Sequence, residues 1–436
     1  MLISFSLGNF LSFSSTNTLS FIATSVKDKN ESSFYPPSYQ WDYRLLRSIG
    51  IMGFNSAGKT NFLKGIAAMK YAVLYSGTSA VNVFQTTTRP YLLRKENNEP
   101  TFFEISFFLH NIKYRYGYKV LNNLIDEEWL FNAEPKIREV NLFTRKGRGI
   151  TCNKIWNKQA DNMIETLFKR AQDHTLFLSV LGVLNVAPAV EILKWFEKIT
   201  VIQSFDPNQF ANLTAELMND DILRLNILRL IRDAKLGFDT TAESKLGESE
   251  NSGRISQEFM EFMIQNEILP KNKYRIKTQH IVFNLKGEKA GTVFFDLFEQ
   301  ESAGTKKFFA LIGLLLDAVI RNKILLFDEL DGQFHFAMYE TIIAFFNNPK
   351  MNPKGAQLIF TSHNTTILKK GKLRRDQLYL INKNDLGESK LERFHEKGKT
   401  IRTDTSLEKE FLEGDLKGHP DIKIGLFTGL LDFPDA

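Results

Sequence analysis

Apolar and polar residues alternate in the N-terminal part of the chain in a way that predicts β-strands. Residues 1–13 follow a strand pattern, and residues 18–22 form another short apolar run. The stretch 27–43 is polar and contains two adjacent prolines, so it predicts a loop. Residues 47–52 then predict a buried strand that leads directly into a glycine-rich segment.

Two longer alternating stretches predict an antiparallel layer. Residues 101–109 place apolar side chains on one face, and residues 114–120 do the same with three tyrosines. His110 and Asn111 occupy the expected turn between the two strands. The tyrosine stripe has two interpretations, a base-stacking platform or a packed sheet surface, and we favour the packed surface.

Between residues 155 and 290 the pattern changes to a helical period. Amphipathic helices are predicted over residues 187–196, 215–231 and 255–268. The polar stretch 240–252 predicts a flexible loop. We therefore expect residues 155–290 to form a helical insertion.

The last third of the chain returns to alternating strands and helices. Residues 306–320 are apolar on nearly all sides, as in a buried helix. A strand at 324–327, a helix at 333–346 and a strand at 357–361 form a βαβ unit, whose two strands must be parallel. One more strand is predicted at 377–382. The expected fold is α/β, with a mixed sheet flanked by helices.

These patterns divide the chain into three predicted parts. Residues 1–154 form an N-terminal lobe with the antiparallel layer, residues 155–290 the helical insertion, and residues 291–436 a C-terminal lobe. A chain of 436 residues is long enough for one large core domain that carries such an insertion.

Composition is that of an ordinary soluble globular protein. Hydrophobic residues make up 43% of the chain and charged residues 24%. The single cysteine, Cys152, excludes a disulfide framework and a cysteine-based zinc site. Residues 1–5 lack the charged segment of a signal peptide, and no apolar run is long enough for a membrane span. We therefore expect a cytoplasmic protein with no membrane contact.

The net charge of +6 is modest, but the basic residues are unevenly placed. Several of them gather towards the C-terminus: Lys369, Lys370, Lys372, Arg374, Arg375, Lys397, Lys399 and Arg402. A solvated face is the favoured interpretation, because charge alone does not establish binding. Nucleic acid is retained as a candidate partner, since a basic patch can contact phosphates or an acidic protein.

Residues 53–60 form a complete G-x-x-x-x-G-K-[ST] phosphate-binding loop between a predicted strand and a predicted helix. In such a loop, backbone N–H groups and the helix N-terminus bind phosphate oxygens. Lys59 would bind the β- and γ-phosphates of ATP, and the Thr60 hydroxyl would ligate Mg²⁺. The residues expected to contact the nucleotide here are Gly53, Asn55, Ser56, Ala57, Gly58, Lys59, Thr60 and Asn61.

Two acids and a histidine are the other candidate catalytic groups. Asp328 ends the apolar strand 324–327, where a carboxylate is costly to bury unless it is functional, and its expected role is to hold Mg²⁺. Glu329 would point to the other side of the strand tip and act as general base for the attacking water. His363 follows the neighbouring strand, at the edge where α/β sheets bind ligands, and would sense the γ-phosphate.

The order of these motifs resembles the ABC-type ATPase superfamily that includes SMC, RecF and OLD-like proteins. Residues 8–13 are similar to the "NF-x-SF" strand opening of that group, and residues 301–305 resemble the "ESxGT" signature of stand-alone OLD-like anti-phage ATPases of the RloA/AbiLi and PARIS types. The resemblance implies an ABC-type P-loop ATPase head that forms a head-to-tail homodimer or higher homo-oligomer. Ser302 and Gly304 would then reach the γ-phosphate bound by the other subunit, and Asp331 would contact that subunit. The alternative role for Ser302 is a helix N-cap.

Two features depart from this resemblance. No glutamine has distinctive Q-loop surroundings, and Gln172, before the apolar run 175–180, is chosen over Gln85. OLD nucleases also carry a Toprim nuclease domain after the ATPase, whereas the segment after His363 contains no spaced acidic triad. The resemblance therefore implies a separate effector protein, either a nuclease or a toxin.

The sequence thus predicts an Mg²⁺-dependent ATP hydrolase whose ATP-driven dimerisation controls a separate effector in bacterial anti-phage defence. The runner-up is a RecF- or SMC-like repair ATPase, which stimulation of turnover by duplex DNA would favour. A third interpretation is a non-enzymatic ATP-gated scaffold that sequesters a toxin, and Glu329 argues against it. A transporter subunit is least favoured, because the signature and the β-layer are not transporter-like.

Overall fold

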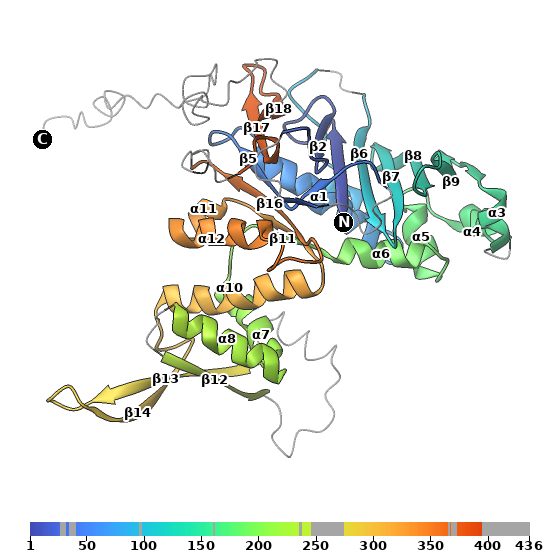
Figure 1. The fold of residues 1–436 in the computed structure, drawn as a ribbon. Coiled ribbons are helices and arrows are strands. Elements are labelled where there is room, and N and C mark those ends of the chain that lie inside the picture. The colour runs from blue at the N-terminus through green and yellow to red at the C-terminus, as the bar shows by residue number, and fades with distance from the viewer. Residues whose placement is uncertain are drawn as a thin grey trace, which may run out of the picture. The chain divides into compact units, whose positions relative to one another are not determined.

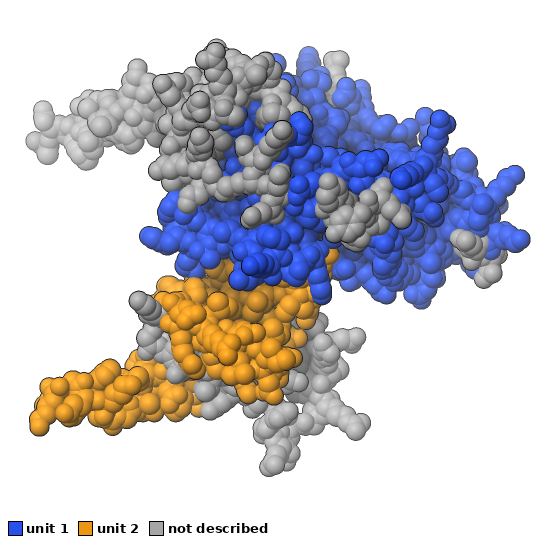
Figure 2. All heavy atoms as spheres, viewed as in Figure 1, with its two compact units in different colours: residues 1–203, 323–436 blue, residues 204–322 orange. Residues whose placement is uncertain are grey.

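The computed structural model divides the chain into two compact units (Figure 2). Unit 1 comprises Met1–Gln203 and Lys323–Ala436, and unit 2 comprises Ser204–Asn322. The residues that the structure describes are 1–26, 32–34, 41–95, 98–159, 162–234, 238–245, 274–364, 367 and 373–394. Unit 1 therefore combines segments that are far apart in the sequence, and unit 2 is inserted between them.

The centre of unit 1 is a six-stranded sheet in the order β11-β15-β16-β5-β17-β18 (Figure 1). Its strands are β5 (Ser48–Met52), β11 (Ile199–Ile202), β15 (Ile324–Phe327), β16 (Gln357–Ser362), β17 (Leu378–Lys383) and β18 (Ser389–Arg393). The first five strands in this order are parallel and β18 is antiparallel. Strands β5, β15 and β16 are buried along their whole length, as expected for parallel strands covered on both faces. The predicted mixed sheet is confirmed.

The helix predicted over residues 333–346 is present between β15 and β16, and a short helix precedes it. The structure has a four-residue helix α11 (Leu330–Gln333) and a longer helix α12 (Phe336–Asn347). The ring of His335 caps α12 by accepting a hydrogen bond from the Ala337 N–H. The expected βαβ connection between two parallel strands is confirmed, since β15 and β16 pair in parallel.

A seven-stranded antiparallel sheet, in the order β10-β9-β8-β7-β6-β1-β2, forms another layer of unit 1. Its strands are β1 (Leu2–Gly8), β2 (Asn17–Ser20), β6 (Thr101–Leu109), β7 (Ile112–Leu121), β8 (Leu124–Ala133), β9 (Val140–Lys146) and β10 (Gly149–Cys152). Tyr114, Tyr116 and Tyr118 are buried in the core, so the packed-surface interpretation is confirmed. The predicted turn is also confirmed, because His110 and Asn111 have positive φ angles between β6 and β7.

Helices and a short strand pair complete unit 1. They are β3 (Ser33–Phe34), β4 (Leu45–Leu46), α1 (Lys59–Tyr75), α2 (Phe84–Thr87), α3 (Lys154–Gln159), α4 (Ile164–Arg170), α5 (Phe177–Val183) and α6 (Ala189–Glu197). The apolar stripe of α1 is buried, as its helical spacing predicts. The ring of Trp195 in α6 stacks on Phe107 of β6 with centroids 4.0 Å apart, which attaches α6 to the antiparallel layer.

Unit 2 contains helices and a three-stranded antiparallel sheet in the order β12-β13-β14. Its elements are α7 (Pro207–Leu217), α8 (Asp221–Asp233), β12 (Phe238–Lys245), β13 (Tyr274–Phe283), β14 (Lys289–Asp296) and α10 (Ala303–Ile320). Helices α7 and α10 cross closely where Gly313, without a side chain, donates its N–H to the Thr214 hydroxyl at 3.1 Å. The predicted buried helix at 306–320 is confirmed as α10.

The prediction of a single helix over residues 215–231 is wrong. Its place is taken by the end of α7 and by α8, because the Asp220 side chain accepts hydrogen bonds from the N–H groups of Ile222 and Leu223 and so caps a new helix. The amphipathic pattern of the sequence continues from α7 into α8, so the pattern does not reveal where one helix ends and the next begins. In the described part of the chain, no helix is both long and apolar enough to span a membrane.

The predicted helical insertion, residues 155–290, is not all helical and does not coincide with unit 2. Its first part belongs to unit 1, where β11 pairs with β15. The stretch 240–252, predicted as a loop, is strand as far as Lys245 because it pairs with β13. The rest of that stretch and the helix predicted over 255–268 lie outside the described residues. Unit 2 instead continues to Asn322 and takes in the start of the predicted C-terminal lobe.

Candidate functional site

The glycine-rich loop connects β5 to α1, and β18 supports it. Gly58 has a φ of +115°, and a Cβ at this position would collide with the Ser389 hydroxyl, so only glycine fits. The Ser389 hydroxyl donates a hydrogen bond to the Ala57 carbonyl at 2.6 Å. A residue from a distant part of the sequence therefore fixes the conformation of the loop.

The strand–loop–helix context of the predicted phosphate-binding loop is confirmed. Gly53 and Ala57 are buried at its base, while Asn55 and Ser56 are exposed. Thr60 and Asn61 lie on the first turn of α1 and are partly exposed. The exposed atoms of this loop and helix N-terminus are available for phosphate oxygens, which is the contact that the motif predicts.

Lys59 is the buried cation of this loop. Its Nζ donates hydrogen bonds to the Gly53 carbonyl at 2.8 Å and the Phe54 carbonyl at 3.0 Å. Burial lowers the pKa of Lys59 below its ordinary value, and the negative charges of the nearby acids, Glu329 foremost, oppose this shift. The structure thus brings the loop lysine and the acids after β15 together, as the sequence predicts.

The topology of the sheet explains this proximity. Strands β15 and β5 flank β16 and all three are parallel, so their carboxyl ends lie at one edge. At this edge the Thr361 hydroxyl donates to Asp328 Oδ1 at 2.7 Å and accepts from the Glu329 N–H, also at 2.7 Å. Thr361 therefore positions both acids. The sequence analysis did not identify it, although a hydroxyl residue two positions before His363 was a usable signal.

Asp328 and Glu329 differ in environment, as their different predicted roles require. Asp328 is buried, whereas Glu329 is exposed. Glu329 has φ +47° and ψ +54°, a left-handed conformation that is uncommon for this residue type. Such conformations tend to occur at functional sites.

His363 and Asp331 contact each other. The His363 N–H donates to Asp331 Oδ2 at 3.2 Å, and the ring Nε2 lies 3.5 Å from the same oxygen. The His363 side chain is 43% exposed, whereas that of Asp331 is 6% exposed. Asp331 therefore positions the histidine within its own chain, and its role in a dimer stays a prediction.

Gln172 is not brought to the phosphate-binding loop by any hydrogen bond of the described residues. It is exposed, between α4 and α5. Its carbonyl accepts from the Thr175 N–H at 3.1 Å and from Arg145 of β9 at 3.4 Å. These contacts attach its backbone to the antiparallel layer, and its assignment as the Q-loop residue stays a prediction.

The signature residues Ser302 and Gly304 belong to unit 2. The Ser302 hydroxyl accepts a hydrogen bond from the Thr305 N–H at 3.1 Å and so caps α10. The N-cap alternative raised by the sequence is thus confirmed. It is compatible with the predicted phosphate contact, because a helix N-terminus with its cap also attracts anions.

Thr60 and Asp328 provide oxygen atoms of the kind that Mg²⁺ prefers. Among the described residues, no group of three or more histidine, cysteine, aspartate and glutamate side chains could hold a metal ion. One hydroxyl and one carboxylate from the protein are a donor set that fits Mg²⁺ whose other ligands are nucleotide phosphates and water.

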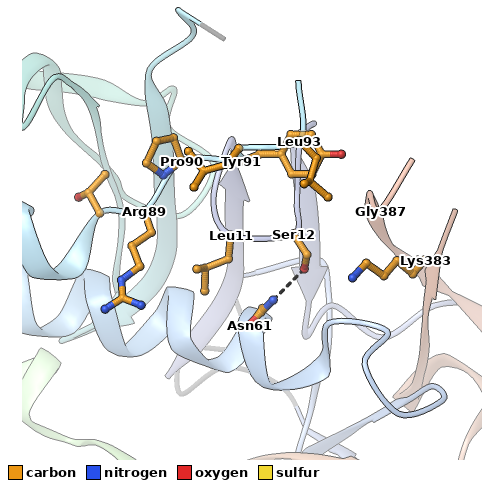
Figure 3. Close-up of a pocket in the computed structure, with 11 residues that line it drawn as sticks. Leu11, Ser12, Asn61, Arg89, Pro90, Tyr91, Leu93, Lys383 and Gly387 are labelled. Carbon is orange, nitrogen blue, oxygen red and sulfur yellow. Dashed lines mark hydrogen bonds between the residues drawn. The ribbon is translucent and has the colours of Figure 1, made fainter. Parts of the chain in front are cut away.

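A cavity of about 500 Å³ opens beside the first turn of α1 (Figure 3). Its lining residues come from three parts of unit 1 and include Leu11, Ser12, Asn61, Thr88, Arg89 and Lys383. The Asn61 side chain donates to the Ser12 hydroxyl at 2.9 Å, and the buried Thr88 hydroxyl has no hydrogen-bond partner among the described residues. The walls of this cavity are largely apolar, with a few polar groups among them, and it offers space next to the phosphate-binding loop for the remainder of a nucleotide.

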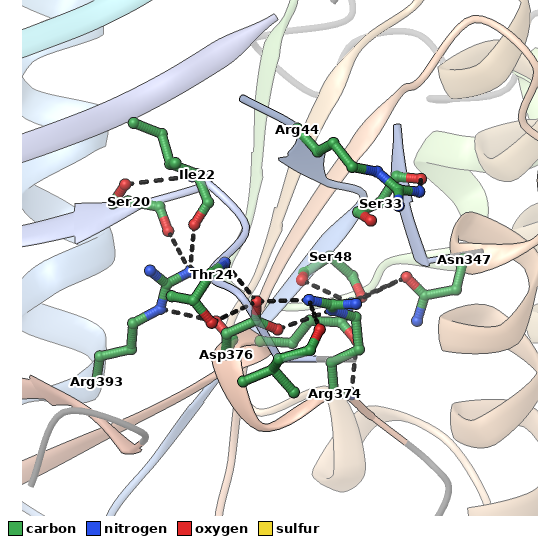
Figure 4. A network of polar contacts seen from close by, with 12 residues as sticks. Ser20, Ile22, Thr24, Ser33, Arg44, Ser48, Asn347, Arg374, Asp376 and Arg393 are labelled. Carbon is green, nitrogen blue, oxygen red and sulfur yellow. Dashed lines mark hydrogen bonds and ion pairs between the residues drawn. The ribbon is translucent and has the colours of Figure 1, made fainter. Parts of the chain in front are cut away.

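Arg374, one of the basic residues expected on a solvated face, is instead buried (Figure 4). Its guanidinium forms two hydrogen bonds of 2.8 Å with the Asp376 carboxylate and donates to the Val26 carbonyl at 2.9 Å. The surface prediction is therefore wrong for Arg374, because an acid two residues away compensates its charge. Arg375 is partly exposed, and the remaining basic residues of the predicted surface lie outside the described residues.

A family model matches residues 48–369, which is well over half of the chain. Its description is "AAA domain, putative AbiEii toxin, Type IV TA system". The chain belongs to this family. Together with the parallel sheet and the phosphate-binding loop, the match shows the mixed α/β fold of P-loop ATPases. The match does not extend to the OLD-like subgroup that the sequence resembles.

Solved structures of ATPase heads align with most of the chain at low identity. The crystal structure of the SmcHead bound to the C-winged helix domain of ScpA is 12% identical, covers 90% of this chain and 96% of that chain, and has a TM-score of 0.43. The recombination mediator protein RecF with ATP is 12% identical, with coverage of 90% and 97% and a TM-score of 0.30. These similarities support no conclusion about function. No curated protein matches the chain.

Proposed function

We propose that this chain is an Mg²⁺-dependent ATP hydrolase. One observation carries the proposal: the phosphate-binding loop with Lys59 and the acids Asp328 and Glu329 follow parallel strands, β5 and β15, at the same carboxyl edge of the sheet. Family membership supports the same conclusion. The cavity beside Asn61 accounts for the part of the nucleotide beyond its phosphates.

Each residue has a defined task in this proposal. The loop N–H groups and Lys59 bind the phosphates, and Lys59 exchanges its two carbonyl partners for phosphate oxygens. Thr60 and Asp328 hold Mg²⁺, which when bound neutralises charge on the phosphate oxygens. Glu329 accepts a proton from the attacking water, and His363 donates a hydrogen bond to the γ-phosphate.

Beyond hydrolysis, we propose that two chains dimerise head to tail when ATP is bound and that the dimer controls a separate effector. The support is the signature-like segment of unit 2, whose N-cap serine and helix N-terminus are suited to an anion. An ATPase that regulates must have nucleotide states that differ in affinity for another molecule. Anti-phage defence in the bacterial cytoplasm is the proposed setting, consistent with the toxin–antitoxin description of the family.

A RecF- or SMC-like role in DNA binding is the second candidate. The resemblance of residues 8–13 and the uneven basic charge of the chain favour it. Turnover measured with and without duplex DNA separates the two candidates. Strong stimulation by DNA supports the repair role, whereas ATP-dependent retention of a nuclease or toxin supports defence.

We expect Lys59→Ala to weaken ATP binding by about 10- to 100-fold, because charge-assisted hydrogen bonds to the phosphates are lost. Equilibrium titration with a fluorescent ATP analogue measures this effect. Lys64→Ala is the matched control, since Lys64 is an exposed lysine on the same helix. Equal affinities for wild type and Lys59→Ala would contradict the proposed phosphate site.

We expect Ser302→Arg to abolish ATP-driven dimerisation while nucleotide binding survives, because a long cation replaces the capping serine where the partner's phosphate would dock. The measurement is light scattering with ATP in a Glu329→Gln background. Asn226→Arg, at an exposed position of α8 in the same unit, is the control. An unchanged ATP-dependent increase in mass in the Ser302 variant would remove Ser302 from the interface.

A further inference from the structure

The segment that joins β14 to α10 is attached to the neighbouring strand β13. This segment, residues 297–302, ends at Ser302, the N-cap of α10. At its start, Leu297 is fully buried and donates its N–H to the Ile276 carbonyl at 2.9 Å. The path of the chain into the signature segment is therefore set by β13.

A second attachment lies immediately before the signature serine. The Glu301 carboxylate accepts a hydrogen bond from the Thr278 hydroxyl at 2.5 Å, and the same oxygen lies 2.6 Å from His280 Nε2. Thr278 is fully buried and the Glu301 side chain is 9% exposed, so water competes little for these bonds. Thr278 and His280 are two residues apart on β13 and share one face of the strand.

Helix α10, which follows this segment, is fixed by its packing on α7. Within α10, Gly313 donates to the Thr214 hydroxyl, which in turn donates to the Phe309 carbonyl at 2.7 Å. A Cβ at Gly313 would collide with Thr214, so α10 cannot slide along α7 at this crossing. With α10 held there, Glu301 links the start of this helix to the β13–β14 hairpin through its side chain.

The hairpin itself continues well past this link. Figure 1 shows β13 and β14 extending away from the helices of unit 2. Apolar side chains along its outer part are exposed, namely Ile281, Val282, Phe283, Leu285, Val293 and Phe294. The ring of Phe295 lies against His280, with centroids 4.5 Å apart, and joins the two strands at the level of the link.

We propose that Glu301 is a positioning residue that couples the β13–β14 hairpin to the signature serine. A shift of β13 moves Thr278 and His280 and, through the Glu301 carboxylate, the N-cap Ser302. The inference rests on the proposed function, because it assigns Glu301 to the placement of Ser302 at the ATP bound by a second copy of the chain. In this proposal, a displacement of the hairpin changes the rate of ATP hydrolysis.

The test replaces Glu301 by glutamine, which keeps the size of the side chain but removes its charge and one acceptor oxygen. We expect kcat for ATP to fall about 10-fold or more, as for a misplaced contact residue, with nucleotide affinity of the monomer unchanged. Thr278→Val should lower kcat in the same direction. Glu299→Gln is the control, since Glu299 is exposed in the same segment and forms no side-chain bond with β13 among the described contacts.

Hydrogen exchange of the amides in residues 302–306 separates this inference from the proposed function. We expect faster exchange in Glu301→Gln and Thr278→Val, and no change in Glu299→Gln. Unchanged exchange, or wild-type kcat with Glu301→Gln, would overturn the positioning role. Faster exchange with no ATP turnover even in the wild type would count against the proposed function and leave the structural coupling supported.

Discussion

Glu329→Gln should leave ATP bound and slow its hydrolysis by about 100-fold or more, which is a typical contribution of a general base. Glutamine keeps the size of the side chain and can orient a water molecule, but it cannot accept the proton. The left-handed backbone at Glu329 and the hydrogen bond from its N–H to Thr361 do not depend on the carboxylate, so the fold should persist. Phosphate release and nucleotide titration measure the two effects separately.

The control for this variant is Glu165→Gln. Glu165 is an exposed carboxylate on α4 of the same unit, and it lies outside every motif of the site. We expect it to hydrolyse ATP at the wild-type rate. Wild-type turnover in Glu329→Gln would show that another group removes the proton.

Arg374→Ala should reduce the free energy of unfolding by about 3–5 kcal/mol, because it leaves the Asp376 carboxylate buried without its counter-charge. The side chains of both residues are almost completely buried, and Asp376 also accepts a hydrogen bond from the Thr24 N–H at 2.8 Å. The pair therefore connects the residues just before β17 to an N-terminal segment of unit 1. Denaturant unfolding of the full chain measures the loss.

The matched control is Arg375→Ala, at the next position, where the side chain is partly exposed. We expect a change below about 1 kcal/mol there. Replacing both partners of the buried pair, with Arg374→Met and Asp376→Leu, should recover part of the stability that Arg374→Ala loses. A midpoint for Arg374→Ala equal to that of wild type would contradict the buried ion pair.

The sequence predicted the parts of the site that depend on short, continuous patterns. A strand, a glycine-rich loop and a helix are adjacent along the chain, so their order alone identified residues 53–60. The acids were found because a carboxylate directly after four apolar residues has few structural explanations. Parallel pairing then brought both elements to one edge of the sheet, as βαβ topology requires.

Features that depend on distant residues could not be predicted in this way. The partner carboxylate of Arg374 is local, at Asp376, but the burial of the pair depends on segments far apart in sequence, such as the one that supplies the Val26 carbonyl. Ser389 supports the phosphate-binding loop across a similar distance. The break before α8 was missed for a local reason, since Asp220 caps a helix without interrupting the apolar period.

The most direct test of the central claim is the identity of the nucleotide that the protein retains. Wild-type chain and the Glu329→Gln variant are incubated with radiolabelled ATP and Mg²⁺, separated from free nucleotide, and denatured. We expect ADP from the wild type and ATP from the variant. Equal proportions of ADP from the two proteins, or no retained nucleotide from either, would contradict an ATP-hydrolysing site built on Lys59, Asp328 and Glu329.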